Sequence, residues 1–212
     1  MTAVERRLRE RQQRIHEIIE SAKHIFTAKG LANATMLDIA ERSELSRRTI
    51  YLYFNNKDEV SLAVASDSLA KLGNSVEEVS RHQGPAIDKL KDVLEVYLSM
   101  NRTDPASFQV ILNFDTSVRA LGERHELVGK CYGEIARLRR LIAGLLSEGA
   151  LDGSIRAFPD AKVAAATLVA LVHSTLHSAS SSANILLGPL GLEPRIFIAE
   201  TFDILLGYLI RK

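Results

Sequence analysis

Two adjacent arginines stand before a cluster of aromatic residues in the segment from Ser43 to Lys57, which reads SELSRRTIYLYFNNK. On a helix with about 100° of rotation per residue, the centre of this segment divides into two faces. One face would carry two guanidinium groups and a phenol: Arg47, Arg48, Tyr51 and Leu52. The other would be mostly apolar: Thr49, Ile50, Tyr53 and Phe54. Guanidinium and phenol hydrogens suit phosphate oxygens and base edges, so the pattern is typical of a helix that lies in the major groove of DNA.

Two short helices must position this polar face. The first is expected from about Met36 to Ser43, with Thr35 as N-cap and Asp38 three residues later, a capping box with Asp in place of Glu. The second is expected to begin after Ser46, its own N-cap. A longer helix precedes them and is expected to end at Gly30. Its apolar stripe consists of Ile15, Ile18, Ile19, Ala22, Ile25 and Phe26.

An alternative interpretation is a helical hairpin whose charged face is only solvated. An isolated pair of arginines favours that interpretation. Here, however, two short helices joined by the sequence SELS follow a longer helix, which is the spacing of a helix-turn-helix. The arginines also stand near the start of the second short helix, where base-reading residues normally lie. We therefore expect DNA binding.

The run from Ile15 to about Ala65, above all TMLDIAERSELSRRTIYLYFNNKDEV, resembles the DNA-binding domain of the TetR family of transcriptional regulators. The resemblance rests on the threonine cap, the Asp-Ile-Ala core, the Leu-Ser entry to the second helix, the Thr-Ile-Tyr-x-Tyr-Phe block and the lysine-acid pair after it. It implies a sequence-specific regulator, a homodimeric repressor released from a palindromic double-stranded DNA operator by a small-molecule effector. It also implies DNA-binding roles for Thr35, Arg47, Arg48, Thr49, Tyr51, Tyr53 and Lys57.

Two places depart from the family pattern. Glu44 stands where relatives usually have glycine in the turn. In a left-handed conformation this residue would be strained by roughly 1 kcal/mol, and its carboxylate would add negative charge close to DNA. Met36 and Leu37 fill positions where many relatives carry a polar or basic contact residue. Specificity is therefore expected to rest on the second short helix.

The composition is that of an ordinary globular protein. The 212 residues are 46% hydrophobic and 25% charged, with a net charge of +1. Residues 1–57 hold 11 Lys and Arg against 7 Asp and Glu, whereas the remaining residues hold 16 against 19. This asymmetry indicates an N-terminal part that faces DNA and a body with another task.

The periodicity predicts an all-α protein with two domains. All five prolines fall between helix-periodic segments, and no convincing strand pattern is present. We expect a helix-turn-helix DNA-binding domain at 1–60 and a larger helical effector-binding and dimerisation domain at 61–212. Further helices are expected at about 57–80, 86–102, 105–119, 123–149, 160–186 and 193–210.

The last two helices are the expected dimer interface, because a single helix-turn-helix binds DNA weakly and gains register from pairing. The helix at 160–186 is rich in Ala and Ser, and the one at 193–210 carries an apolar stripe. Two helices from each subunit would form a four-helix interface, as the resemblance also implies. The alternative is that both helices only complete the monomer core. The predicted interface residues are Ala170, His173, His177, Phe202, Leu206 and Leu209.

The middle helices are the expected place for a small apolar or amphipathic effector. In relatives this region encloses a ligand pocket, and apolar and aromatic linings are typical of such pockets. The alternative for each residue is plain core packing. The predicted pocket residues are Tyr97, Met100, Phe108, Leu112, Cys131 and Tyr132.

Other classes of function find little support. Ser68 and Lys71 form an isolated S-x-x-K, and no glycine-rich phosphate loop or G-x-S-x-G is present, so we expect neither an enzyme nor a cofactor. His173 and His177 are spaced to present two imidazoles, but no carboxylate or cysteine lies nearby in sequence, so no metal is expected. The second candidate that keeps DNA binding is a constitutive or architectural DNA-binding protein without small-molecule control.

The sequence indicates a cytoplasmic protein with no membrane partner. The charged N-terminus lacks the apolar core of a signal peptide. The longest nearly apolar run, 163–172, is short of the roughly 20 residues that span a bilayer. The single cysteine, Cys131, fits a reducing compartment. The N-terminal stretch VERRLRERQQR is either an arm that tracks DNA or a solvated helix end.

Overall fold

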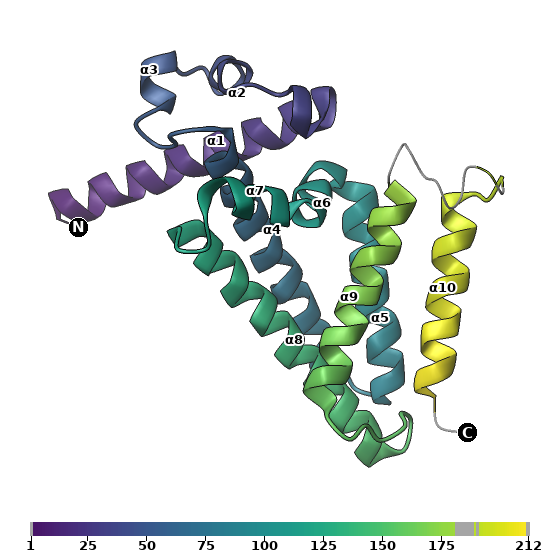
Figure 1. Ribbon diagram of the computed structural model, residues 1–212. Helices are drawn as coiled ribbons and strands as arrows, with labels where there is room; N and C mark the ends of the chain where they lie inside the picture. Colours follow the sequence, from purple (N-terminus) through teal and green to yellow (C-terminus); the bar gives the residue numbers. More distant parts are fainter. Residues whose placement is uncertain (1, 181–188, 190, 211–212) are drawn as a thin grey trace. The chain divides into compact units, whose positions relative to one another are not determined.

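The computed structural model describes residues 2–180, 189 and 191–210, and within them the chain is all-α (Figure 1). The helices are α1 (Ala3–Asn33), α2 (Met36–Arg42), α3 (Arg47–Ile50), α4 (Lys57–Ser80), α5 (Ala86–Thr103), α6 (Pro105–Leu112), α7 (Phe114–Leu121), α8 (Glu126–Asp152), α9 (Ala161–Ser180) and α10 (Pro194–Leu209). The described residues contain no strand beyond one isolated bridge between Ile155 and Ile210.

The predicted all-α class is confirmed, and most predicted helix bounds lie within a few residues of those observed. The predicted helix at 105–119 is wrong, because the chain forms α6 and α7 with a break at Asn113. The amide of Asn113 donates to the Gln109 carbonyl at 2.8 Å, and such side-chain bonds compete with the helical ladder. Residues 181–186 of the predicted helix at 160–186 lie outside the described residues.

The chain divides into two compact units. The first contains residues 1–70 and 101–132, and the second contains residues 71–100 and 133–212. These units do not coincide with the predicted division at residue 60, since α6, α7 and the start of α8 group with the N-terminal helices.

A buried lysine joins three helices inside the first unit. The Lys23 ammonium on α1 lies 2.9 Å from a carboxylate oxygen of Glu20 and 2.9 Å from one of Asp67 on α4. Asp104, whose carboxylate caps α6, lies 3.9 Å from the same ammonium. A buried cation is tolerated only when it is paired, and the carboxylates of Asp67 and Asp104 pair Lys23 of α1 with α4 and with the start of α6. The apolar core beside them includes Ile18, Ile39, Ile50, Leu62 and Phe108, each at most 1% exposed.

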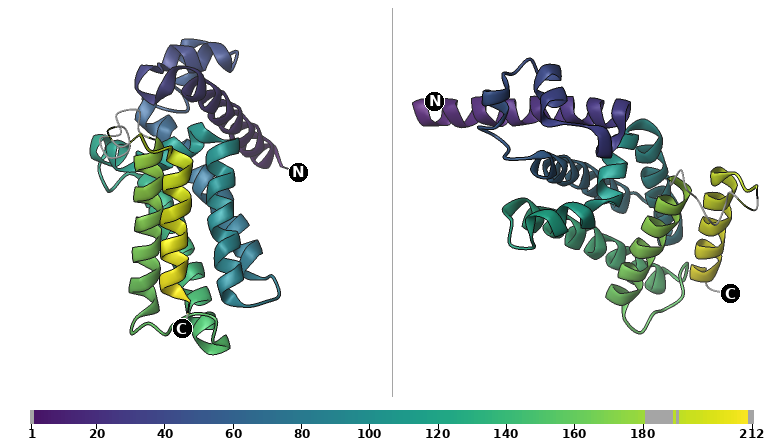
Figure 2. Two further views of the ribbon diagram at one scale, coloured as in Figure 1. Left: turned by 90° about the vertical axis from the view of Figure 1, so that its right-hand side faces the viewer. Right: turned by 45° about the horizontal axis from the view of Figure 1, so that its top comes forward.

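The second unit is built on α5, α8, α9 and α10. Helices α9 and α10 lie side by side (Figure 2). The end of α10 is fastened to the α8–α9 connection, where Arg156 N–H donates to the Leu209 carbonyl at 2.9 Å. The Arg156 guanidinium also lies over the ring of Tyr208, 4.5 Å from its centroid. Gly149 permits this arrangement, because a Cβ there would lie 2.4 Å from the side chain of Ile155.

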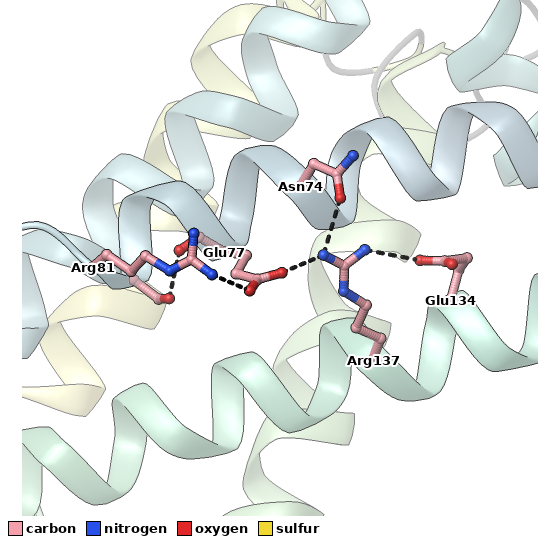
Figure 3. A network of polar contacts seen from close by, with 6 residues as sticks. Asn74, Glu77, Arg81, Glu134 and Arg137 are labelled. Carbon is pink, nitrogen blue, oxygen red and sulfur yellow. Dashed lines mark hydrogen bonds and ion pairs between the residues drawn. The ribbon is translucent and has the colours of Figure 1, made fainter.

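A polar network joins the last turns of α4 to α8 in the second unit (Figure 3). The Arg137 guanidinium donates to the Glu77 carboxylate and to the Asn74 amide oxygen, the latter at 2.9 Å. Glu134, one turn earlier on α8, lies 3.4 Å away. The hydrogen bond to Glu77 raises the pKa of Arg137 and lowers that of Glu77, so both groups stay charged.

Candidate DNA interface

Helix α2 begins with the predicted capping box. The Thr35 hydroxyl accepts from Asp38 N–H at 3.2 Å, and the Asp38 carboxylate accepts from Thr35 N–H at 3.0 Å. The same carboxylate accepts the Thr35 hydroxyl proton at 2.8 Å. The hydrogen bond from Lys29, supported by Thr35, lowers the pKa of Asp38 to about 2. Since its only hydroxyl proton is already donated, Thr35 serves the cap in this structure, and its predicted contact with DNA stays a prediction.

The turn after α2 has the Schellman arrangement. Leu45 N–H donates to the Ala40 carbonyl at 2.9 Å, and Glu44 N–H donates to the Glu41 carbonyl at 3.2 Å. Glu44 has φ 55° and is the one non-glycine residue with positive φ among the described residues. Glu44 therefore adopts the left-handed conformation in which a side chain is strained. A residue with a Cβ is strained there by roughly 1–2 kcal/mol.

The Glu44→Gly variant is expected to raise the free energy of unfolding by up to about 1 kcal/mol. Glycine relieves the strain of a left-handed residue but costs backbone entropy, so the net gain is smaller than the strain itself. Urea denaturation measures it. The control is Glu41→Gly, the second-to-last residue of α2, where φ is negative and glycine is expected to lose up to about 1 kcal/mol. Equal losses in both variants would contradict the strain at Glu44.

Helix α3 presents its two arginines to solvent. Ser46 caps the helix by accepting from Thr49 N–H at 3.0 Å, and the Thr49 hydroxyl lies 2.7 Å from the Ser46 hydroxyl. Ile50 is fully buried and anchors the helix on the core. Arg47 and Arg48 are exposed, and neither has a hydrogen bond or ion pair with another described residue. Two unpaired guanidinium groups on one side and a buried anchor on the other are what groove docking requires.

The tyrosines after α3 differ in exposure. Tyr51 is 42% exposed, and its hydroxyl has no partner among the described residues, so it is free to reach a phosphate. Tyr53 is half-buried, and the Arg11 guanidinium of α1 lies over its ring, 5.2 Å from the centroid. Arg11 was not among the predicted site residues. The signal for it in the sequence is helical register, since Arg11 shares a face of α1 with the buried Ile18, seven residues later.

Lys57 has partners within the protein. Its ammonium donates to the carbonyls of Leu31 and Ala32, at 2.8 and 3.0 Å, and its predicted contact with a phosphate stays a prediction. These carbonyls follow Gly30, where φ is 76° and the helical geometry of α1 is interrupted as predicted. The carbonyls at a helix end need donors, and Lys57 supplies them. Its role in this structure is to hold the start of α4 against the end of α1.

The segment after the recognition helix is held by a buried carboxylate. Glu59 is 9% exposed and accepts from the backbone N–H and the side-chain amide of Asn55, at 2.7 and 2.8 Å. His125, just before α8, lies 3.3 Å from the same carboxylate. Burial alone would raise the pKa of Glu59, but these hydrogen bonds outweigh it and hold the pKa below its ordinary value. The carboxylate therefore connects the end of the helix-turn-helix to the α7–α8 connection.

The Glu59→Gln variant is expected to lower the free energy of unfolding at pH 7 by about 1–2 kcal/mol, because bonds to a charged acceptor become bonds to a neutral one. Because the pKa of Glu59 is lower in the folded state, its carboxylate stabilises the fold fully at pH values above the ordinary pKa of 4.5. This stabilisation is lost as the pH falls through the folded-state pKa. The difference from the parent should therefore shrink in acid. Urea denaturation at pH 7 and near pH 4 measures it, with Glu78→Gln, exposed on the same helix, as control. A constant difference at both pH values would exclude the charged form as its cause.

The six predicted pocket residues divide between the two units. Tyr97 and Met100 belong to the second, and Phe108, Leu112, Cys131 and Tyr132 belong to the first. The second unit contains an apolar cavity of about 40 Å³, and burial raises the pKa of Tyr97, which lines it, to about 12. Of the six predicted pocket residues, only Tyr97 lines this cavity. The other lining residues are Leu90, Val93, Leu94, Ile142, Leu168, Val169, Val172, Leu205, Leu206 and Leu209.

The predicted interface residues also separate. Ala170 and His177 are exposed on α9, and His173 is half-buried with its ring stacked 6.3 Å from that of His177. Leu206 is half-buried and lines the cavity. Phe202 and Leu209 are 5% and 3% exposed, so the monomer already covers most of both side chains, and their predicted contact with a second subunit stays a prediction. The large apolar side chains that α9 and α10 leave exposed are Val163, Leu171, Ile196, Ile204 and Tyr208, here called the α9–α10 face.

In this helix-turn-helix, the second short helix is capped by Ser46, anchored by Ile50 and exposes two arginines that have no partner among the described residues. Such an arrangement defines a DNA-binding protein. Residues 18–64 match the family model of bacterial regulatory proteins, tetR family. The regulator TtgR of Pseudomonas putida is 39% identical over 82 residues, which are 36% of this chain and 39% of TtgR. The fatty acid metabolism regulator protein of Bacillus subtilis (strain 168) is 21% identical over 169 residues, 80% of this chain and 84% of that protein.

The fold extends the likeness beyond the N-terminal segment. The crystal structure of FadR from Bacillus subtilis in complex with stearoyl-CoA superposes with a TM-score of 0.68 at 18% identity, over 92% of this chain and 98% of that one. Residues 18–64 thus carry the likeness to the tetR family of transcriptional regulators, and over the rest of the chain the likeness is one of fold. The relatives of the chain are regulators, and some of them bind a ligand.

Proposed function

We propose that the chain is a cytoplasmic, homodimeric repressor that binds a palindromic operator and leaves it when a small apolar or amphipathic effector binds. The observation that carries the proposal is the exposed, unpaired pair Arg47 and Arg48 on a short helix anchored by Ile50. Such a helix reads a few base pairs, and two of them are needed for a specific site. The predicted contacts of Thr49, Tyr51 and Tyr53 with DNA remain part of this proposal.

The α9–α10 face supports dimerisation. Helix α9 is the one described helix that is long and apolar enough to cross a membrane, yet core helices of soluble proteins share that property. Only 28% of its most apolar window is buried. Beside it runs an open hollow of about 380 Å³ between α9 and α10, lined mostly by apolar side chains that include Val163, Leu171 and Tyr208. A second copy of the same face would cover this apolar surface and form a four-helix interface.

The effector remains a proposal with a specific difficulty. Ligand pockets usually measure about 300–1,000 Å³, far more than the 40 Å³ cavity of the second unit. A ligand would therefore have to separate the helices that line it, and in doing so would favour another arrangement of the body. Ligand and DNA would then weaken each other reciprocally. The small cavity is also what the second candidate function predicts, a constitutive or architectural DNA-binding protein without an effector.

Selection of bound sequences from a random duplex pool, at near-physiological salt, tests the proposal. Recovery of a palindrome supports a dimeric, sequence-specific regulator. Recovery of no consensus, with steeply salt-dependent binding, would support the architectural alternative. Because the FadR structure holds stearoyl-CoA, this amphipathic thioester is the first probe for release from the selected operator. A panel of acyl chain lengths without any release would favour the constitutive alternative.

A further inference from the structure

The first turns of α1 form a helix that the rest of the first unit does not cover. Residues 2–13 are all exposed, and the first strongly buried side chain of α1 is Ile18. The helix nevertheless begins with a complete capping box, in which Thr2 N–H donates to the Glu5 carboxylate at 2.7 Å and the Thr2 hydroxyl accepts from Glu5 N–H at 3.2 Å. An N-cap of this kind stabilises a helix by about 1 kcal/mol and so favours a continuous helix over an unstructured tail. We call residues 2–14 the N-terminal extension.

The N-terminal extension is basic, and part of its charge is unpaired. It holds five arginines against two glutamates. Arg6 lies 3.8 Å from Glu10, and Arg14 lies 2.6 Å from Glu17. The other three arginines, Arg7, Arg9 and Arg11, have no carboxylate within 4 Å among the described residues.

Helical register points two of these arginines to the side of the helix-turn-helix. At about 100° per residue, Arg7 and Arg11 lie within roughly 20° of the direction of the buried Ile18. Arg9 lies roughly 180° away from it, on the opposite face. The contact of the Arg11 guanidinium with the Tyr53 ring, 5.2 Å from its centroid, confirms the direction. Arg7 stands one turn further out, about 6 Å along the same face.

We propose that Arg7 and Arg11 extend the DNA-binding surface beyond the recognition helix and contact backbone phosphates outside the bases that α3 reads. The inference rests on DNA binding but needs no palindrome, since phosphate contacts do not depend on sequence. Tyr53 holds Arg11 beside the end of the helix-turn-helix. Arg7 lies about 6 Å further out along α1, a distance that corresponds to about two base pairs of a duplex. Each neutralised phosphate adds about 0.9 to the slope of log affinity against log salt.

The experiment compares the Arg7→Gln/Arg11→Gln variant with Arg9→Gln in the full chain. Affinity for a mixed-sequence duplex, and for a selected operator, is measured by fluorescence anisotropy from about 50 to 200 mM salt. The double variant is expected to bind roughly tenfold or more weakly at the lowest salt, with a slope smaller by about 3–4 for the four side chains of a dimer. Base preference in the operator should not change. Circular dichroism checks that the extension stays helical in both variants.

Three results would overturn the inference. The first is a double variant that matches Arg9→Gln in affinity and slope. The second is that Arg9→Gln loses as much affinity per removed charge as the double variant does. The arginines would then act through the general positive field of the protein and not through a contact face. The third is a changed base preference in the double variant, because that would place these arginines at base edges. A parent that bound no duplex at any salt would instead overturn DNA binding itself.

Discussion

Arg48→Ala is expected to lower affinity for the selected operator by at least about 30-fold at near-physiological salt and to relax the preference at one base pair of each half-site. A bidentate arginine–base contact discriminates by roughly 1–3 kcal/mol, and a dimer loses two of them. Arg48 is exposed, has no partner among the described residues and stands on a helix anchored by Ile50, so its removal leaves the fold intact. Anisotropy titrations against single-base operator variants measure both effects.

Two further variants separate the loss of a base contact from the loss of a positive charge. Arg47→Ala, one residue earlier and equally unpaired, shows which arginine reads a base and which one meets a phosphate. Arg139→Ala removes an exposed arginine of α8, in the second unit, and should bind like the parent. If the Arg47 and Arg48 variants both bound every operator variant like the parent, α3 would not be the docking helix.

Ile204→Glu is expected to convert the proposed dimer to a folded monomer, with a dissociation constant raised by more than about 100-fold. Ile204 is 70% exposed and is the most exposed residue of the α9–α10 face, so the monomer does not depend on its packing. At the interface, a carboxylate would be buried without a partner, and two such carboxylates would come from the two subunits, which costs several kcal/mol. Sedimentation or light scattering across a concentration series measures the oligomeric state.

A matched control for this variant is available within the same unit. Leu151 at the end of α8 is 91% exposed and does not belong to the α9–α10 face. Leu151→Glu should therefore remain dimeric. The Ile204 variant should also lose most of its affinity for a palindrome, since each half-site is then bound separately. A parent that is monomeric at all concentrations, or an Ile204 variant that stays dimeric, would show that another surface pairs the subunits.

The local architecture of the helix-turn-helix could be predicted because its signals lie three or four residues apart. The caps Thr35 and Ser46, the interruption at Gly30 and the left-handed Glu44 are each decided by neighbours in the chain. Lys57 could not be placed in the same way. Its partners lie 25 and 26 residues earlier, and only the packing of α4 against α1 brings them together.

The body was harder to predict for a different reason. An apolar stripe on a helix shows that one side is covered, but not whether the cover is the same chain or another one. On α10, Phe202 turned inward while Ile204, two residues later, stayed exposed. Likewise Tyr97 and Cys131 are both buried apolar residues of the middle helices, yet they belong to different units. A single sequence does not show whether an apolar side chain is covered by its own chain or by another, or to which unit it belongs.

The bond from Lys57 to the end of α1 couples the helix-turn-helix to the direction of α4. Lys57 is the first residue of α4, and its ammonium holds the two carbonyls from which the chain enters α2. Helix α4 has 24 residues and is therefore about 36 Å long. If one end of a rod of that length tilts by about 5°, the other end moves by about 3 Å, which is close to the rise of one base pair. A tilt of α4 by a few degrees would therefore be enough to shift a helix-turn-helix attached at Lys57 by about one base pair.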